Sequence, residues 1–323
     1  MNKVNVKLMT TLIQNNQRYT KKLLSHFLRN YYEEGSVFET KDYLYAIGDI
    51  PIALVAHMDT VFEAGVPAER QVLYDKSKGI MFCPQGGGFD DKAGIYAILQ
   101  IVKSGLRPHV IFTTDEETGA LGASALAIKT CPFKDLRYII QLDRRNVDDC
   151  VFYDCDNPEF VKYVEEFGFV EHFGTFSDIS VLCPAWGVAG VNLSVGYEHE
   201  HTRYETLYVR ALNETIKKVK AMLSVEKIPS FKYIPLAYTF APGYTSKDIC
   251  RCAKCQHYFF PEEVFPTVSV TGATVYYCPD CIAESKIGWC SECGHPFEAL
   301  SLKDEYHCVI CEEKLKCQCE PKN

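Results

Sequence analysis

The sequence has neither an excess of basic residues nor a long apolar run. Its 323 residues include 34 Lys and Arg against 42 Asp and Glu, which gives a formal net charge of -8. Binding to nucleic acid or to an anionic membrane requires a basic surface, so we expect neither partner. No run of about 18 apolar residues occurs, so no membrane span is expected. The apolar stretch at 8–13 is too brief for a signal peptide, and we expect a cytoplasmic protein.

Cysteine is scarce through most of the chain and crowded near its end. Of 16 cysteines, five are scattered through the first 249 residues and eleven fall in the last 74. The scattered thiols are typical of reduced, buried cysteines in a cytosolic protein. The crowded ones are regularly spaced, as metal ligands are. We therefore predict a large domain at 1–225, a linker at 226–248 that packs on it, and a cysteine-rich zinc-binding domain at 249–323.

Short apolar strands alternate with helical segments through the first 225 residues. Helices are predicted at 6–34, 93–104, 120–128, 159–167 and 210–223. Strands are predicted at 37–40, 43–47, 52–56, 110–113, 138–142 and 188–195. This alternation predicts an α/β domain with a mixed, mostly parallel sheet sandwiched by helices.

Side chains that bind metals follow successive predicted strands. In an open α/β sheet, ligands bind beyond the carboxyl ends of the strands. Four predicted strands end in such residues, and a loop of three glycines brings two more to the start of a helix. The residues are His57 and Asp59; Asp115, Glu116 and Glu117; Asp143; Glu198, His199 and His201; and Asp90 and Asp91. Imidazole and carboxylate groups on one sheet edge predict a metal site.

Five short motifs carry a family resemblance. They are AHMDTV at 56–61, GFDDKAG at 88–94, TTDEETG at 113–119, QLD at 141–143 and EHTRYET at 200–206. In this order they resemble the co-catalytic zinc exopeptidases of peptidase clan MH. The resemblance covers roughly residues 1–225 and implies an enzyme that hydrolyses peptide bonds with two catalytic zinc ions, or with manganese or cobalt.

The resemblance also assigns the ligands of the first metal. It implies that His57 binds this metal, that Asp59 orients His57, and that Asp143 completes the site. Asp90 is implied to bridge both metals, and Asp91 to support the site or cap the following helix. A cis peptide bond between Asp90 and Asp91 is a further implication.

The second metal and the catalytic base follow from the two later motifs. Glu117 and His201 are implied to complete the second site, with His199 as the competing histidine. Glu116 is implied to act as the general base for a metal-bridging hydroxide. Adjacent glutamates can divide these roles because neighbouring side chains at a strand end point in different directions.

Two departures bear on the substrate. Only 57 residues lie between Asp143 and His201, too few for the lid domain of many relatives, so the chain resembles the single-domain aminopeptidases. Arg144 and Arg145 directly follow the metal aspartate and are either surface residues or a grip for a substrate carboxylate. The leading prediction is an aminopeptidase or small-peptide exopeptidase. The alternatives are an N-acyl-amino-acid deacylase or carboxypeptidase, and a catalytically silent scaffold that acts through its zinc module.

Four Cys-x-x-Cys motifs define the end of the chain. Their cysteines are Cys252 and Cys255, Cys278 and Cys281, Cys290 and Cys293, and Cys308 and Cys311. Such motifs in pairs are typical of tetrahedral zinc, so two structural zinc ions in a zinc-ribbon-type domain are predicted. Sequential pairing is favoured, while the spacing also allows interleaved pairing, and a disulfide scaffold is the alternative. Because this segment is acidic, a protein partner fits it better than nucleic acid.

Overall fold

The chain forms two compact units, Met1–Ala237 and Tyr238–Asn323. The computed structural model describes residues 4–62, 70–174, 176–236, 250–254, 258–259, 264–268, 274–283, 287–289 and 296–298. None of the helices among these residues combines the length and the apolar character needed to cross a bilayer.

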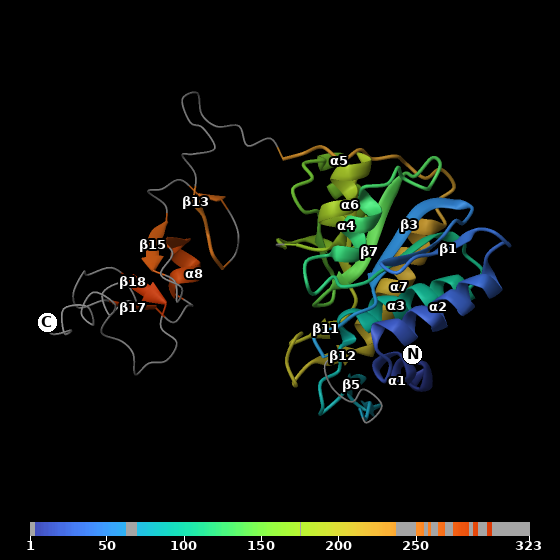
Figure 1. The fold of residues 1–323 in the computed structure, drawn as a ribbon, viewed down its shortest axis with the longest axis horizontal. Helices are drawn as coiled ribbons and strands as arrows, with labels where there is room; N and C mark the ends of the chain where they lie inside the picture. The colour runs from blue at the N-terminus through green and yellow to red at the C-terminus, as the bar shows by residue number, and fades with distance from the viewer. Residues whose placement is uncertain are drawn as a thin grey trace, which may run out of the picture. The chain divides into compact units, whose positions relative to one another are not determined.

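A mixed sheet forms the centre of the first unit (Figure 1). Its strands are β1 (Val37–Glu39), β2 (Tyr43–Ala46), β3 (Ile50–His57), β6 (Pro108–Thr113), β7 (Tyr138–Arg144), β8 (Asp149–Val151), β9 (Val170–Glu171) and β10 (Gly190–Ser194). They lie in the order β1-β2-β6-β3-β7-β10-β8-β9. The central strands β6, β3, β7 and β10 run parallel, whereas β1 with β2, β2 with β6 and β8 with β10 pair antiparallel. The predicted mixed, mostly parallel sheet is confirmed.

Helices cover both faces of the sheet (Figure 1). They are α1 (Val6–Ile13), α2 (Gln17–Tyr31), α3 (Phe89–Lys103), α4 (Leu121–Ala127), α5 (Pro158–Glu165), α6 (Asp178–Trp186) and α7 (Val209–Leu223). Along β3, Leu54 belongs to the core shared with α1, α2, α3 and α7, while Ala53 and Val55 belong to the core shared with α4 and α6. Successive strand side chains point to opposite faces, so β3, β6 and β7 contribute to both cores, whereas β10 contributes Val191 and Leu193 to the first.

Two helical predictions need correction. The predicted helix at 6–34 is two helices, because the Asn16 side chain accepts a hydrogen bond from the Tyr19 N–H and starts α2 anew. Asparagine favours this capping position. Helix α6 was not predicted, since it contains Pro184, which interrupts a helical pattern.

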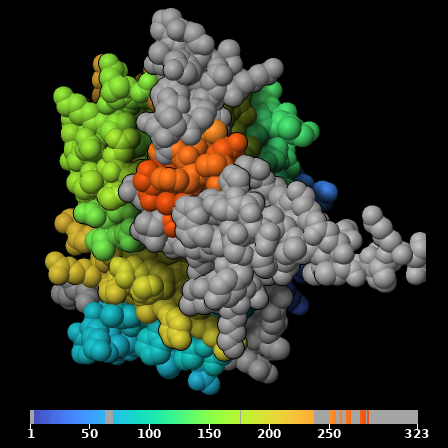
Figure 2. Space-filling view, turned by 90° about the vertical axis from the view of Figure 1, so that its left-hand side faces the viewer, coloured from blue at the N-terminus to red at the C-terminus, as the bar shows by residue number. Residues whose placement is uncertain are grey.

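A second, smaller sheet lies beside the first and carries one of the predicted metal ligands. Its strands are β4 (Leu73–Asp75), β5 (Ile80–Phe82), β11 (Tyr197–Glu198) and β12 (Thr206–Tyr208), in the order β11-β12-β5-β4. In the space-filling view, the cyan surface around β4 and β5 adjoins the yellow surface around β11 and β12 (Figure 2). The turn between β11 and β12 contains His201.

The segment after α7 continues along the first unit. The Phe231 N–H donates to the Arg137 carbonyl, and the Phe231 carbonyl accepts from the Ala189 N–H, both at 3.0 Å. The Phe231 ring is buried and packs against Phe160 and Tyr163. The first part of the predicted linker is therefore held against the first unit by both backbone and ring contacts.

The described part of the second unit consists of short strands and one short helix. The elements are β13 (Cys250–Arg251), β14 (Tyr258–Phe259), β15 (Phe265–Val268), β16 (Thr274–Tyr277), α8 (Pro279–Ala283), β17 (Ile287–Trp289) and β18 (Pro296–Glu298). Strands β13 and β14 form a hairpin, and the others form a sheet in the order β16-β15-β18-β17.

Candidate metal centre

The carboxyl ends of the central parallel strands bring the predicted residues of the first unit together. His57 ends β3, Glu116 and Glu117 follow β6, and Asp143 lies near the end of β7. A cavity of about 220 Å³ opens at this edge of the sheet. Its lining residues include Asp90, Glu116, Glu117, Asp143, Arg144, Arg145, Tyr197, Glu200 and His201.

Helix α3 brings the paired aspartates to the same place. A methyl group at Gly94 would lie 1.9 Å from the Leu142 carbonyl oxygen, so only glycine lets α3 approach β7 this closely. The peptide bond between Asp90 and Asp91 is cis, as the family resemblance implies. This approach places Asp90 beside His57 and Asp143.

Asp90 lies between two histidines and presents a different carboxylate oxygen to each. Its Oδ1 lies 3.1 Å from His57 Nε2, and its Oδ2 lies 3.2 Å from His201 Nε2. Asp143 Oδ1 lies 3.5 Å from the same His57 nitrogen, and Glu117 Oε2 lies 3.0 Å from the same His201 nitrogen. The five predicted ligands thus form two groups that share Asp90.

The spacing of these donor atoms fits two metal ions. Tetrahedral zinc with bonds of about 2.0–2.1 Å to nitrogen and oxygen places its donor atoms about 3.3 Å apart. The contacts around His57 Nε2 are 3.1 and 3.5 Å, and those around His201 Nε2 are 3.2 and 3.0 Å. Each group could hold one cation, with Asp90 common to both.

His201, and not His199, belongs to this arrangement. His201 lines the cavity, and its side chain lies between Asp90 and Glu117. His199 is not among the lining residues. His199 and His201 both have a positive φ, of 59° and 62°, so the contacts of the side chains and not the backbone conformation distinguish them.

Asp59 connects the ends of two strands. Its Oδ1 lies 3.3 Å from His57 Nδ1, so the imidazole has this carboxylate on one side while its Nε2 faces Asp90 and Asp143 on the other. The same carboxylate accepts hydrogen bonds from the Glu116 N–H at 3.0 Å and the Glu117 N–H at 3.1 Å. Carboxylates behind a metal-binding histidine commonly fix its orientation. Asp59 fixes the positions of His57 and of both glutamates.

The carboxylate of Asp91 has different partners from that of Asp90. Its Oδ2 accepts a hydrogen bond from the His57 N–H at 3.1 Å, and its Oδ1 accepts one from the Gly94 N–H at 2.9 Å. A ligand atom of Asp91 also lies within 4.8 Å of ligand atoms of His57 and Asp143. Since both of its oxygens already accept from backbone amides, we interpret Asp91 as a support for β3 and α3.

Several residues that hold the candidate ligands were not assigned a role from the sequence. Asp143 Oδ2 accepts hydrogen bonds from Gln141 Nε2 at 2.9 Å and from Ser177 Oγ at 3.1 Å. Tyr197 OH donates to Asp143 Oδ1 at 3.2 Å. The sequence shows these as ordinary polar residues, and only folding brings them to the aspartate.

Glu205 is the most unexpected of these supporting residues. It is fully buried, and its carboxylate accepts hydrogen bonds from the Asp90 N–H at 2.9 Å and from the Gly88 N–H. It therefore fixes the glycine-rich loop from which Asp90 projects. Glutamate is seldom fully buried, so its residue type alone would suggest a surface position. The one signal in the sequence was its place in the EHTRYET motif.

The pKa values of the carboxyl groups reflect a buried, acidic site. Burial raises the pKa of Glu116 to about 9, with a further rise from Asp143, Asp178 and Asp90 and a lowering by His57. Burial and the charge of Asp90 raise the pKa of Asp143 to about 7. Divalent cations here would lower these pKa values, because nearby positive charge favours the ionised carboxylate.

The two arginines after Asp143 line the same cavity. Arg145 Nη1 lies 2.8 Å from Glu200 Oε1, so this guanidinium already has a carboxylate partner. Arg144 Nη2 donates to the Phe173 carbonyl at 3.1 Å, and Arg144 Nε lies 3.6 Å from Asp149 Oδ2. Of the two, Arg144 has the weaker contact with a carboxylate.

In the second unit, the structure places three of the eight predicted zinc ligands. The sulfur atoms of Cys252, Cys278 and Cys281 lie within 4.8 Å of one another. The other five, Cys255, Cys290, Cys293, Cys308 and Cys311, lie outside the described residues. Both structural zinc ions therefore stay predictions, and the described cysteines bear on one of them.

The fold of the first unit is similar to the folds of several solved structures. No protein-family profile and no curated protein sequence matches the chain. The structure of a TET aminopeptidase from a marine-sediment thaumarchaeon has a TM-score of 0.55 and 14% identity, covering 69% of this chain and 97% of that chain. Aminopeptidase PepT from Bacillus cereus has a TM-score of 0.52 and 16% identity, covering 67% and 96%. An aminopeptidase from Desulfurococcus kamchatkensis has a TM-score of 0.52 and 14% identity, covering 68% and 94%. The first unit is therefore similar in fold to aminopeptidases.

Proposed function

We propose that the first unit is a metal-dependent aminopeptidase or small-peptide exopeptidase. The observation that carries this proposal is Asp90, whose two carboxylate oxygens each face a different histidine. His57 and Asp143 would hold one divalent cation, Glu117 and His201 the other, and Asp90 both. Two zinc ions, or manganese or cobalt, would supply Lewis acidity toward the substrate carbonyl and would make water more acidic.

Glu116 is the proposed general base. Its carboxylate lines the cavity, while its backbone N–H is fixed by Asp59. In the ionised form it accepts a proton from the water that attacks the peptide carbonyl carbon. It returns that proton to the nitrogen of the leaving amine as the carbon–nitrogen bond breaks. Glu117, its neighbour, is directed at His201 and is therefore not available for this role.

The lining of the cavity supports a short substrate with a free amino terminus. Acidic side chains dominate it, among them Glu116, Glu117 and Glu200. Asp90, Glu117 and Asp143 are candidate metal ligands and Glu200 is paired with Arg145, so among the lining carboxylates Glu116 is the one that could attract a cationic terminal amine. The volume of about 220 Å³ favours one or two substrate residues over the middle of a long chain.

The function is tested by the cleavage of a peptide panel. We expect the purified chain to hydrolyse short peptides with free amino termini and to leave the same peptides with acetylated termini intact. A chelator should abolish the activity, and added zinc, manganese or cobalt should restore it. Hydrolysis that persists after verified removal of all metal would contradict the proposal.

A deacylase or carboxypeptidase remains the second candidate because Arg144 lines the cavity. In that case the guanidinium would bind the substrate carboxylate through charge-assisted hydrogen bonds, worth about 1.5–3 kcal/mol. Arg144→Gln would then raise KM by about 10- to 100-fold for substrates with a free carboxylate. Substrates ending in an amide should be unaffected, and Arg144→Lys should retain part of the binding.

The matched control is Arg145→Gln, since Arg145 is already paired with Glu200. An aminopeptidase that does not read the carboxylate would show equal KM values for acid and amide substrates in all three variants. That result would support the aminopeptidase and exclude a deacylase or carboxypeptidase that uses Arg144 to bind the substrate carboxylate.

A further inference from the structure

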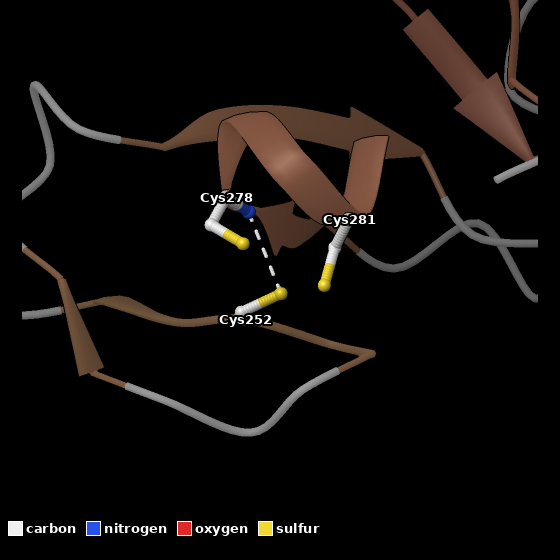
Figure 3. Close-up of side chains that lie close together, drawn as sticks. All are labelled: Cys252, Cys278 and Cys281. Atoms are coloured by element: carbon white, nitrogen blue, oxygen red, sulfur yellow. Dashed lines mark hydrogen bonds between the residues drawn. The ribbon is translucent and has the colours of Figure 1, made fainter. Parts of the chain in front are cut away.

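Three cysteine sulfur atoms converge in the second unit (Figure 3). Cys252 directly follows β13, Cys278 directly precedes α8, and Cys281 lies within α8. All three residues are buried, with exposed fractions of 0%, 5% and 9%. Their sulfur atoms lie within 4.8 Å of one another. Tetrahedral zinc with bonds of about 2.3 Å places its sulfur ligands about 3.8 Å apart, so a small contraction would suffice to bind it.

We propose that the first and second Cys-x-x-Cys motifs together hold one structural zinc ion. Cys252, Cys278 and Cys281 are three of its ligands, and Cys255, the other cysteine of the first motif, lies outside the described residues. The two motifs that follow would then form a site of their own. This is sequential pairing, since interleaved pairing would place Cys252 with the third motif.

The backbone brings these two motifs together independently of their sulfur atoms. Cys252 forms a parallel bridge with Tyr276, and the Ala253 N–H donates to the Tyr276 carbonyl at 2.6 Å. The first motif is therefore in register with β16, which runs directly into the second motif. In addition, the Cys278 N–H donates to Cys252 Sγ at 3.4 Å (Figure 3). Hydrogen bonds of this kind support thiolate ligands.

The apolar cluster around these sulfur atoms is small among the described residues. It consists of the three cysteines and Tyr277, with Ala253, Phe259, Val275 and Ile282 partly buried around them. Small domains commonly gain stability from a structural metal ion. A structural zinc ion supplies about 10–16 kcal/mol of apparent binding free energy at neutral pH, which would come chiefly from its thiolate ligands.

Alkylation of cysteines, mapped by peptide mass spectrometry, tests the pairing in the full chain. In the wild-type protein with zinc, we expect the cysteines of all four motifs to be protected from iodoacetamide. Cys278→Ser should expose Cys252, Cys255 and Cys281 together, while the third and fourth motifs stay protected. The zinc content should fall by about one ion per chain. Cys250→Ser is the matched control, because Cys250 lies outside the cluster, and it should change neither result.

A second measurement covers the case in which Cys278→Ser unfolds the whole unit and exposes every motif. Slow removal of zinc from the wild-type protein by a competing chelator should release cysteines in groups. Cys252 should become reactive in the same kinetic phase as Cys278 and Cys281. The proposal is overturned if Cys252 is released with the third motif, if these thiols react freely in zinc-saturated protein, or if they react only after a reductant opens a disulfide.

Discussion

Replacing Glu116 with glutamine is expected to lower turnover by about 10²–10⁴, the usual contribution of a general acid–base group. Glutamine has nearly the same shape but cannot accept and return a proton. The backbone N–H of residue 116 would still donate to Asp59, so the loop after β6 should keep its position. Because Glu116 is in neither group of candidate ligands, the metal content should stay at the wild-type value. The measurement is kcat on a short unblocked peptide, together with metal analysis of the same preparation.

Glu117→Gln is the informative comparison, since the two glutamates are adjacent and differ in direction. The Glu117 carboxylate lies 3.0 Å from His201 Nε2, so we expect this variant to lose metal as well as activity. Wild-type turnover of the Glu116→Gln protein would show that Glu116 is not the general base. It would also favour the view that the chain is a silent scaffold, provided that partner binding then depends on the cysteines.

The positions at which strands end indicated the candidate metal-binding residues, and the family resemblance then selected five of them as ligands. A short apolar strand followed at once by His57 and Asp59, or by Glu116 and Glu117, can be recognised locally. Parallel strands then bring such ends to one edge without further information. The cis peptide bond between Asp90 and Asp91 was expected from the family resemblance carried by the motif around Asp90, and the structure has it.

Residues that act through distant contacts could not be predicted in this way. Glu205 supports Asp90 across 115 positions of the sequence, and Tyr197 supports Asp143 across 54. The residues next to Glu205 and Tyr197 in the sequence do not reveal these supporting roles. Whether a side chain is buried beside a ligand depends on the packing of the whole unit. The strands β4, β5, β11 and β12 were missed because each has only two or three residues. A hydrophobic period cannot be recognised over so short a length.

The pairing of the cysteine motifs shows the same limit. Spacing identifies Cys252 and Cys278 as ligands but does not say that they share an ion. The deciding contact is the bridge between Cys252 and Tyr276, which belongs to the backbone register of the folded unit. Local pattern therefore predicts which residues bind, and tertiary structure decides which of them bind together.

Asp90→Asn is expected to remove at least one of about two metal ions from the first unit and to abolish most of the activity. Both candidate sites use this carboxylate, one oxygen facing His57 and the other facing His201. An amide keeps one oxygen and replaces the other with an uncharged NH₂ group, which cannot bind a cation. The difference in metal content from wild type is the measurement, so zinc held by the cysteines does not affect the comparison.

Asp91→Asn provides the matched control, because the two aspartates are adjacent but their oxygens have different partners. Asp91 accepts from the His57 and Gly94 amides, and an asparagine could accept from only one of them. Leaving a buried donor without a partner costs about 1–3 kcal/mol. For a unit of this size that loss corresponds to a decrease in Tm of roughly 2–12 °C. We therefore expect Asp91→Asn to keep its metals but to have a lower Tm than wild type when both are compared without metal, and Asp90→Asn to lose metal while its metal-free Tm stays near that of wild type. The opposite result, in which Asp91→Asn loses metal and Asp90→Asn binds as much metal as wild type, would contradict this assignment. The carboxylate shared by the two metal sites would then not be that of Asp90.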